Sequence, residues 1–359
     1  MKTPLFSNTE ILVCVGSGGV GKTTVAAALA VLAAKEGKKV LVLTIDPAKR
    51  LAQTLGIEGS KDITRVPNQN FKGELYASVI DHKKTFDDFV ARAAQKSNAA
   101  KKILDNRLYK QLSTNLSGSQ EFTSIEKLYS CYESKQFDLI ILDTPPTKHA
   151  IDFLNAPQKL AALFSDSVAK WFRDPEGKKS GFFTGLIQTG TRQVFKVLEL
   201  LTGSGFIKEL ADFFANIEQW QDKLQKRTVD VQRMLVSEKT QFCLVTSFDQ
   251  AKLKEAEFFS REIKKGGYHL STVILNRAFP HWLHWDQQKG KEPSNKKLAA
   301  FYTQMKSYYS AREEAYQQFE SRLSRDARIF RIPDLVSDIS DLQGLEEFSK
   351  LIAQEEKKA

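Results

Sequence analysis

Near its N-terminus the chain reads Gly16-Ser17-Gly18-Gly19-Val20-Gly21-Lys22-Thr23. This segment follows an apolar, β-prone run at 11–15 and opens an Ala- and Leu-rich pattern, typical of a helix, at 22–35. A strand, a glycine-rich turn and a helix with the spacing G-x-x-x-x-G-K-[ST] are the features of a loop that binds phosphate. From average composition, a chain of this length contains the pattern by chance in roughly one case in a hundred.

Each residue of this loop has an expected role. Glycines let consecutive N–H groups point at phosphate oxygens, and the start of the helix adds the positive end of its dipole. Lys22 would reach the β- and γ-phosphates, Thr23 would bind Mg²⁺, and Thr24 would contact the α-phosphate. The backbone cradle would be formed by Gly18, Gly19, Val20 and Gly21.

Two carboxylates are placed to complete a nucleotide site. Asp143 closes the apolar run 139–142, and Asp46 closes the run 40–45. Because the carboxyl ends of strands converge on the ligand crevice of an open α/β sheet, both should lie near the loop. We expect Asp143 to hold Mg²⁺ together with Thr23, and Asp46 to orient the water that attacks the γ-phosphate.

The rest of the chain predicts an α/β fold with a doubly wound, mostly parallel sheet and an inserted helical subdomain. Short apolar runs alternate with helical patterns, which favours strands covered on both faces by helices. No strand pattern occurs at about 85–135 or 150–238, and we assign 85–135 and 151–238 to the helical subdomain. The nucleotide-binding core would then comprise 1–84, 136–150 and 239–359. Its expected strands are 11–15, 40–45, 75–80, 139–142, 242–246, 273–275 and 329–332.

Composition excludes several classes of protein. Apolar residues make up 42% and charged residues 27% of the 359 residues, which is typical of a globular chain. The longest apolar run, 25–34, is too short to cross a bilayer, and the N-terminus lacks the layout of a signal peptide, so we expect a cytoplasmic protein. The net charge is +10, but no sequence motif for reading nucleic acid accompanies it, so no specific nucleic-acid partner is expected.

Three segments together resemble the ArsA/GET family of P-loop ATPases, which includes the arsenite-pump ATPase and the targeting ATPase for tail-anchored membrane proteins. The family carries a G-K-G-G-V-G-K-T-T loop, a D-P-A-H segment and a D-T-A-P-T-G-H segment. Here these stand as Gly16-Ser17-Gly18-Gly19-Val20-Gly21-Lys22-Thr23-Thr24, Asp46-Pro47-Ala48-Lys49 and Asp143-Thr144-Pro145-Pro146-Thr147-Lys148-His149. The order and approximate spacing match across the α/β part, and the resemblance is specific only at these motifs.

The resemblance implies ATP and Mg²⁺ as ligands and a dimer that closes around ATP. It implies that Asp46 positions the attacking water and that 143–149 relays the state of the γ-phosphate to the helical subdomain. Asn276 stands where the family has its adenine-contacting asparagine, and an amide can both donate to and accept from adenine. Pro333 stands in the closing strand and loop, where it is expected to border the nucleotide.

The chain departs from the family at one catalytic position. Ser17 replaces a lysine that reaches across the dimer to the partner's phosphates, and charge stabilisation of this kind can contribute about 10³ to 10⁵ in rate. Either a homodimer hydrolyses ATP slowly, or another cation substitutes, or the partner is a paralogous subunit that keeps the lysine. Lys49 is one candidate cation, although a solvated loop lysine without a specific partner is the favoured explanation.

The metal chemistry of the family's branches is not expected. The zinc-binding C-x-x-C is missing after Asn276, and His281 and His284 in that region have no evident third ligand. Cys14, Cys131 and Cys243 are far apart in sequence and read as isolated, buried small hydrophobes. Since As(III) binds several clustered sulfurs, an arsenite-pump ATPase is disfavoured.

The second helical insertion carries apolar side chains at helical spacing, between 160 and 217. They are either core or a groove for the hydrophobic segment of a membrane-protein client. The leading hypothesis is a Mg²⁺-dependent ATPase whose cycle controls that client-binding region, with at most peripheral membrane contact. The alternatives are an ATP-binding regulatory subunit of a heterodimeric ATPase, and a partition or positioning ATPase.

Overall fold

The computed structural model of the protein describes residues 4–45, 50–57, 62–93, 119–144, 221–278, 295–323, 327–335 and 338–358. Within these ranges, none of the helices has both the length and the apolar character that crossing a bilayer requires.

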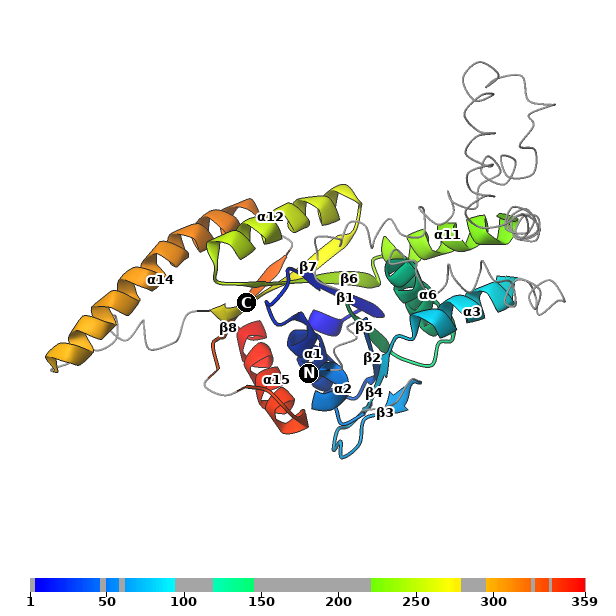
Figure 1. The fold of residues 1–359 in the computed structure, drawn as a ribbon, viewed down its shortest axis with the longest axis horizontal. Helices are drawn as coiled ribbons and strands as arrows, with labels where there is room; N and C mark the ends of the chain where they lie inside the picture. The colour runs from blue at the N-terminus through cyan, green and yellow to red at the C-terminus, as the bar shows by residue number, and fades with distance from the viewer. Residues whose placement is uncertain are drawn as a thin grey trace, which may run out of the picture. The chain divides into compact units, whose positions relative to one another are not determined.

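An eight-stranded sheet with the strand order β3-β4-β2-β5-β1-β6-β7-β8 forms the centre of the fold (Figure 1). Every ladder is parallel except that of β3 with β4. The strands are β1 (Ile11–Gly16), β2 (Lys39–Thr44), β3 (Thr64–Arg65), β4 (Glu74–Val79), β5 (Leu139–Asp143), β6 (Thr240–Ser247), β7 (His269–Ala278) and β8 (Arg328–Pro333).

The expected mostly parallel α/β sheet is therefore confirmed. Each parallel strand overlaps a predicted apolar run, because a strand covered on both faces must be apolar on both. The short edge strand β3 was not predicted, since Thr64-Arg65 carries no apolar pattern. It pairs antiparallel with β4 through the register pairs Thr64 with Ala77 and Arg65 with Tyr76.

Helices cover both faces of this sheet. In Figure 1, α1, α2 and α15 lie on one side, and α12 and α14 lie on the other. The helices of this part are α1 (Lys22–Lys35), α2 (Arg50–Thr54), α12 (Gln250–Lys265), α14 (Lys296–Arg322) and α15 (Leu342–Glu356), and a 3₁₀ turn spans Pro4–Phe6.

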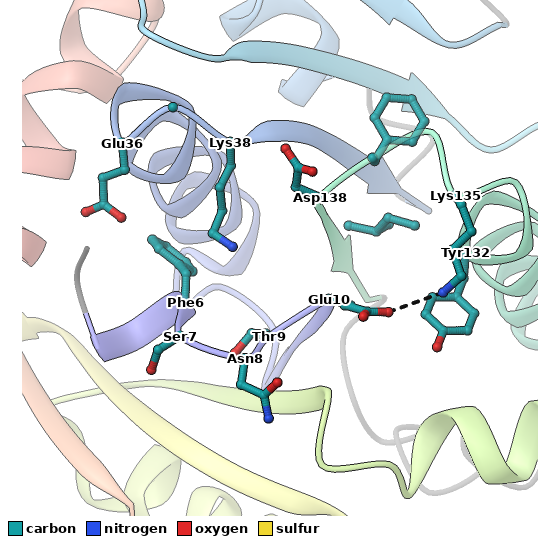
Figure 2. Close-up of a pocket in the computed structure, with 13 residues that line it drawn as sticks. Phe6, Ser7, Asn8, Thr9, Glu10, Glu36, Lys38, Tyr132, Lys135 and Asp138 are labelled. Atoms are coloured by element: carbon teal, nitrogen blue, oxygen red, sulfur yellow. Dashed lines mark hydrogen bonds and ion pairs between the residues drawn. The ribbon is translucent and has the colours of Figure 1, made fainter. Parts of the chain in front are cut away.

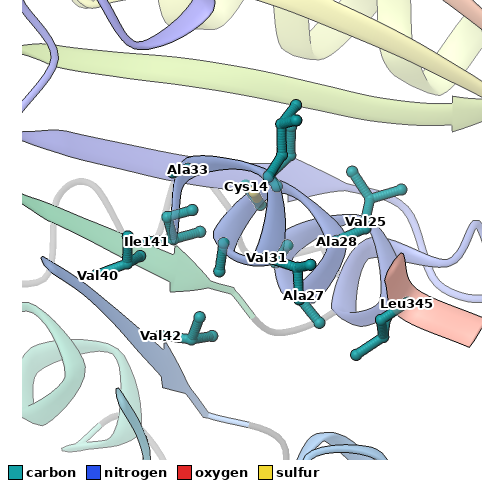
Figure 3. Packing of buried hydrophobic residues seen from close by; sticks show 14 of the residues in the cluster. Cys14, Val25, Ala27, Ala28, Val31, Ala33, Val40, Val42, Ile141 and Leu345 are labelled. Carbon is teal, nitrogen blue, oxygen red and sulfur yellow. The ribbon is translucent and has the colours of Figure 1, made fainter. Parts of the chain in front are cut away.

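Helix α1 is buried around most of its circumference. Its side chains pack on β1, β2 and β5 on one side and on α15 on another, as Figure 3 shows for Val31, Val42, Ile141 and Leu345. A helix that is apolar all round has to be covered all round. The Ala- and Leu-rich composition of 22–35 thus holds the glycine-rich loop rigidly against the centre of the sheet.

The chain divides into two compact units. One comprises Met1–Ile80, Leu128–Ile151 and Met234–Ala359, and the other comprises Asp81–Lys127 and Asp152–Arg233. In its described part the second unit contains α3 (His82–Ala93) and most of α6 (Ser119–Glu133) and α11 (Gln221–Leu235). We call the second the helical unit. The apolar series between 160 and 217, expected to form a client groove or core, lies outside the described residues.

Candidate functional site

The glycine-rich loop connects β1 to α1 as the sequence predicts. Gly21 caps the helix with φ 87° and ψ 26°. This is a left-handed backbone conformation that is energetically unfavourable for residues with a Cβ. Gly16, the last residue of β1, has φ 153°, and a Cβ there would lie 2.0 Å from the carbonyl oxygen of Val245 on β6. Glycine is required at these two positions because of the left-handed backbone at Gly21 and the lack of space for a Cβ at Gly16, and not because the loop has to be flexible.

Lys22 folds back over this loop. Its Nζ donates a hydrogen bond to the carbonyl oxygen of Ser17 at 2.9 Å, and the side chain is only 7% exposed. The ammonium is thus held at the inner side of the loop, where the backbone N–H groups would gather phosphate oxygens. The position fits the role expected for Lys22 at the β- and γ-phosphates.

Asp143 lies at the C-terminal end of β5, between two threonine hydroxyls. Thr23 Oγ1 donates to Asp143 Oδ2 at 2.7 Å, and Thr44 Oγ1 donates to the same oxygen at 2.9 Å. The carboxylate is 1% exposed, and its register partners are Cys14 on β1 and Thr44 on β2. A buried carboxylate next to a hydroxyl supplies the hard oxygen ligands that Mg²⁺ prefers, so the residues present fit that ion.

Thr44 was not predicted as a site residue. It is the last residue of β2, and its side chain is 1% exposed, so its hydroxyl needs a partner inside the protein. The sequence feature that could have indicated a role for Thr44 is its position as a polar residue at the end of an apolar strand, two positions before Asp46. Its bond to Asp143 fixes the orientation of the carboxylate from the β2 side.

The segment after β5 is anchored to the first strand. Thr144 donates to the carbonyl oxygen of Cys14 through its backbone N–H at 3.3 Å and through Oγ1 at 2.8 Å. The chain therefore leaves the site from a fixed point. The other expected residues of this region, Pro145–His149, Asp46 and Lys49, lie outside the described residues, so their roles stay predictions.

Asn276, near the end of β7, packs directly against the loop. Its Nδ2 donates to the carbonyl oxygen of Val20 at 2.9 Å, and a Cβ on Gly21 would lie 2.4 Å from that nitrogen. The structure thus brings Asn276 to the loop, while its contact with adenine stays a prediction. Pro333 ends β8 and is the register partner of Ala278 on β7. None of the described contacts joins Pro333 to the loop.

The expectation of isolated cysteines is wrong for two of the three. Cys14 and Cys243 are register partners on β1 and β6, and both are fully buried. The neighbouring Cys243 thiol and burial hold the pKa of Cys14 well above its usual value, so this thiol stays protonated. The sequence does not reveal this pair, because Cys14 and Cys243 are far apart in the chain and become neighbours only when β1 and β6 pair in the sheet. Among the described residues, no three His, Cys, Asp or Glu side chains group into a metal site.

A surface cavity of about 520 Å³ lies at the other end of the strands (Figure 2). It is lined by residues that precede β1, β2 and β5, such as Glu10, Lys38 and Asp138. Lys135 Nζ donates to Glu10 Oε2 at 3.3 Å at its edge. Ligands of open α/β sheets bind beyond the carboxyl ends of the strands, so this cavity is separate from the candidate nucleotide site.

The site combines a strand, a glycine-rich loop, a buried lysine and a carboxylate that is held by the loop threonine. Together these features are typical of a P-loop nucleotide-binding protein. The sequence signature of the anion-transporting ATPase (ArsA) family matches residues 9–354. The chain belongs to this family, and it is an ATPase of the ArsA/GET type.

Curated relatives are similar along nearly the whole chain. The chain is 25% identical to the ATPase GET3 of Paracoccidioides lutzii over 344 residues, covering 94% of this chain and 88% of that protein. It is 24% identical to the ATPase get3 of Schizosaccharomyces japonicus over 94% of this chain and 90% of that protein. It is 25% identical to the ATPase ASNA1 homolog 2 of Paramecium tetraurelia, covering 94% and 91%.

Proposed function

We propose that this protein is a Mg²⁺-dependent ATPase whose nucleotide cycle controls the helical unit, and that this unit handles hydrophobic segments of membrane-protein clients. The observation that carries the proposal is the arrangement of Lys22, Thr23 and Asp143 around the loop at the carboxyl ends of β1 and β5. Similarity to ATPases named GET3 over 94% of the chain supports the client side of it.

The residues have distinct roles in this proposal. The loop N–H groups and Lys22 bind the β- and γ-phosphates of ATP, and Thr24 binds the α-phosphate. Thr23 and Asp143 would hold Mg²⁺, which when bound neutralises negative charge on the phosphates. Asp46 orients a water for attack on the γ-phosphate, and Asn276 and Pro333 border the base.

Covalent connectivity supports the relay to the helical unit. The chain leaves β5 at Asp143, is tied to β1 at Thr144, and enters the helical unit again at Asp152. A change of contacts at Asp143 is thus only a few residues away from that unit. Phosphate contacts that order such a segment, and their loss on hydrolysis, would switch the unit between two states.

The assembly is proposed to be a dimer closed around ATP, made of two copies or of this chain and a paralogue. One observation bears on the choice. Ser17, at the position of the lysine that reaches across in the family, is 6% exposed, and its Oγ has no hydrogen-bond partner in the described part of the chain. A short, buried hydroxyl does not reach another subunit. This favours, as a second candidate function, an ATP-binding subunit that a lysine-bearing paralogue activates.

The test is nucleotide-dependent capture of a client. A peptide with a single hydrophobic tail helix is offered to the Asp46→Asn variant in ATP and Mg²⁺, and bound peptide is measured beside phosphate release. We expect binding to persist and hydrolysis to fall by about a hundredfold or more, because substrate is bound but water is not oriented.

The controls separate the two halves of the proposal. Lys22→Ala should lose both ATP binding and peptide capture, and a tail peptide interrupted by two arginines should not be captured. Full turnover in Asp46→Asn would remove its assigned role. Capture that does not depend on ATP would contradict nucleotide control of the helical unit. Slow turnover of the intact chain alone, raised by a paralogue, would support the second candidate function.

A further inference from the structure

Among the described residues, those that pack on the apolar face of helix α14 cover it at one end only. Near its C-terminal end, Tyr316 is 0% and Phe319 is 2% exposed. Tyr316 lies near the ring of Phe248, and the guanidinium of Arg331 lies 4.0 Å from the centre of the Tyr316 ring. Nearer the N-terminal end, Leu298 and Phe301 are each 55% exposed and Tyr308 is 50% exposed. In Figure 1 this end of α14 extends away from α12 and the sheet.

The exposed side chains belong to the same face as the buried ones. Leu298, Phe301, Met305 and Tyr308 follow one another at spacings of three, four and three residues, which places them on one stripe of a helix. The opposite face carries small and polar residues, among them Ala300, Thr303, Ser307 and Ser310. The segment 295–312 is therefore amphipathic, and large apolar side chains on it face solvent.

The charge on this segment has one sign. Residues 295–312 contain Lys296, Lys297, Lys306 and Arg312 and no aspartate or glutamate, within a chain of net charge +10. Lys297 lies one turn before Phe301, and Lys306 lies on the other border of the stripe. The Arg312 guanidinium lies 3.4 Å from the centre of the Tyr308 ring, so a cation also sits on the apolar face.

We propose that residues 295–312 of α14 form a surface that docks on an anionic lipid bilayer. The helix would lie in the plane of the membrane, with Leu298, Phe301 and Tyr308 at the boundary between headgroups and acyl chains, and its lysines among the lipid phosphates. A second copy of the chain is a poorer occupant, because a symmetric contact would bring like-charged lysines together. The surface lies apart from the nucleotide loop, so its role does not depend on the proposed ATP cycle.

The experiment is vesicle flotation of the full chain without nucleotide, at about 0.1 M and about 0.5 M salt. The vesicles are pure phosphatidylcholine or contain about 30% phosphatidylglycerol. We expect flotation with the anionic vesicles only, weakening at high salt as charges are screened. The double variant Lys296→Gln/Lys297→Gln should bind about 10- to 30-fold more weakly, since each basic residue near the surface contributes about fivefold.

The apolar part is tested by the triple variant Leu298→Ser/Phe301→Ser/Tyr308→Ser, which should lose flotation. Its matched control is Thr303→Ala/Ser307→Ala on the opposite face, which should float as the parent does. All these side chains are exposed, so each variant should keep the parent's melting temperature and its mass in solution. Equal flotation with neutral vesicles, or unchanged flotation of the triple variant, would overturn the proposal. A halved mass of the triple variant would also overturn it, and would assign the stripe to contact between copies.

Discussion

Ser17 and Gly16 show how tightly the loop is built at the level of single residues. The Ser17 carbonyl oxygen accepts from Lys22, while Gly16 leaves no room for a side chain beside Val245. Both constraints come from backbone positions rather than from side-chain packing. The loop is therefore preorganised by β1 and β6 before a nucleotide binds, which lowers the cost of ordering it on binding.

The space at Gly16 leads to a stability prediction. In Gly16→Ala the new Cβ would meet the Val245 carbonyl, a backbone group held in the sheet, and φ 153° is unfavourable for alanine. We expect a loss of about 3 kcal/mol or more in the free energy of unfolding, measured by denaturant titration.

Gly19→Ala is the matched control, because Gly19 also has a positive φ, of 79°, but nothing lies within 4 Å of its added Cβ. It should cost about 1 kcal/mol, from the left-handed backbone alone. Equal losses in the two variants would show that the contact with Val245 does not matter.

At the level of elements, the helical unit is held by a buried carboxylate. Glu126 on α6 is 1% exposed, and it accepts from Arg227 of α11 through Nε at 3.0 and 2.9 Å and through Nη2 at 2.6 Å. Arg92 of α3 donates to the same group at 3.1 Å. One side chain thus joins three helices that are far apart in sequence, and it belongs to the unit that we propose to respond to ATP.

Breaking this cluster should loosen the helical unit. Glu126→Ala removes a buried carboxylate that both Arg92 and Arg227 contact, and the Arg227 side chain is only 24% exposed. We expect the unit to lose about 2 to 3 kcal/mol, less than for a fully buried pair because Arg92 is half exposed. Asp230→Ala, which breaks the exposed pair with Arg233, should cost about 0.5 kcal/mol. Hydrogen exchange in α3, α6 and α11 would measure the loss of stability in each variant. A loss of similar size in the two variants would contradict the structural role of Glu126.

Across the whole molecule, the sequence predicts well where local pattern and burial agree. Helix 22–35 was expected with the bounds that α1 has, because glycine, lysine and an apolar run mark both of its ends. The positions of the glycine-rich loop between β1 and α1 and of Asp143 at the end of β5 follow from the same kind of local pattern, while their roles at a nucleotide stay predictions. Two features could not be predicted in this way: the pairing of Cys14 with Cys243 and the hydrogen bond from Thr44 to Asp143. Each depends on which strands become neighbours in the sheet. Strand order is a property of the chain's path, and local sequence patterns do not contain it.

The half-covered face of α14 illustrates the same limit. Large apolar residues recur on one face from Leu298 to Phe319, interrupted there by Arg312, and this pattern alone does not separate a buried part from an exposed part. Packing near Phe248 and Arg331 accounts for the buried end, whereas the exposed end has charge around it. The difference between core and contact surface therefore lies in tertiary structure and not in the spacing.

The most direct test of nucleotide control is hydrogen exchange of the Asp46→Asn variant with ATP and Mg²⁺ and without nucleotide. Peptides from the loop should gain protection, and peptides from 81–127 and 152–233 should change their protection at the same ATP concentration. Lys22→Ala should show neither change. Protection confined to the loop, with ATP shown to be bound and the helical unit unchanged, would contradict the relay from Asp143 to the helical unit.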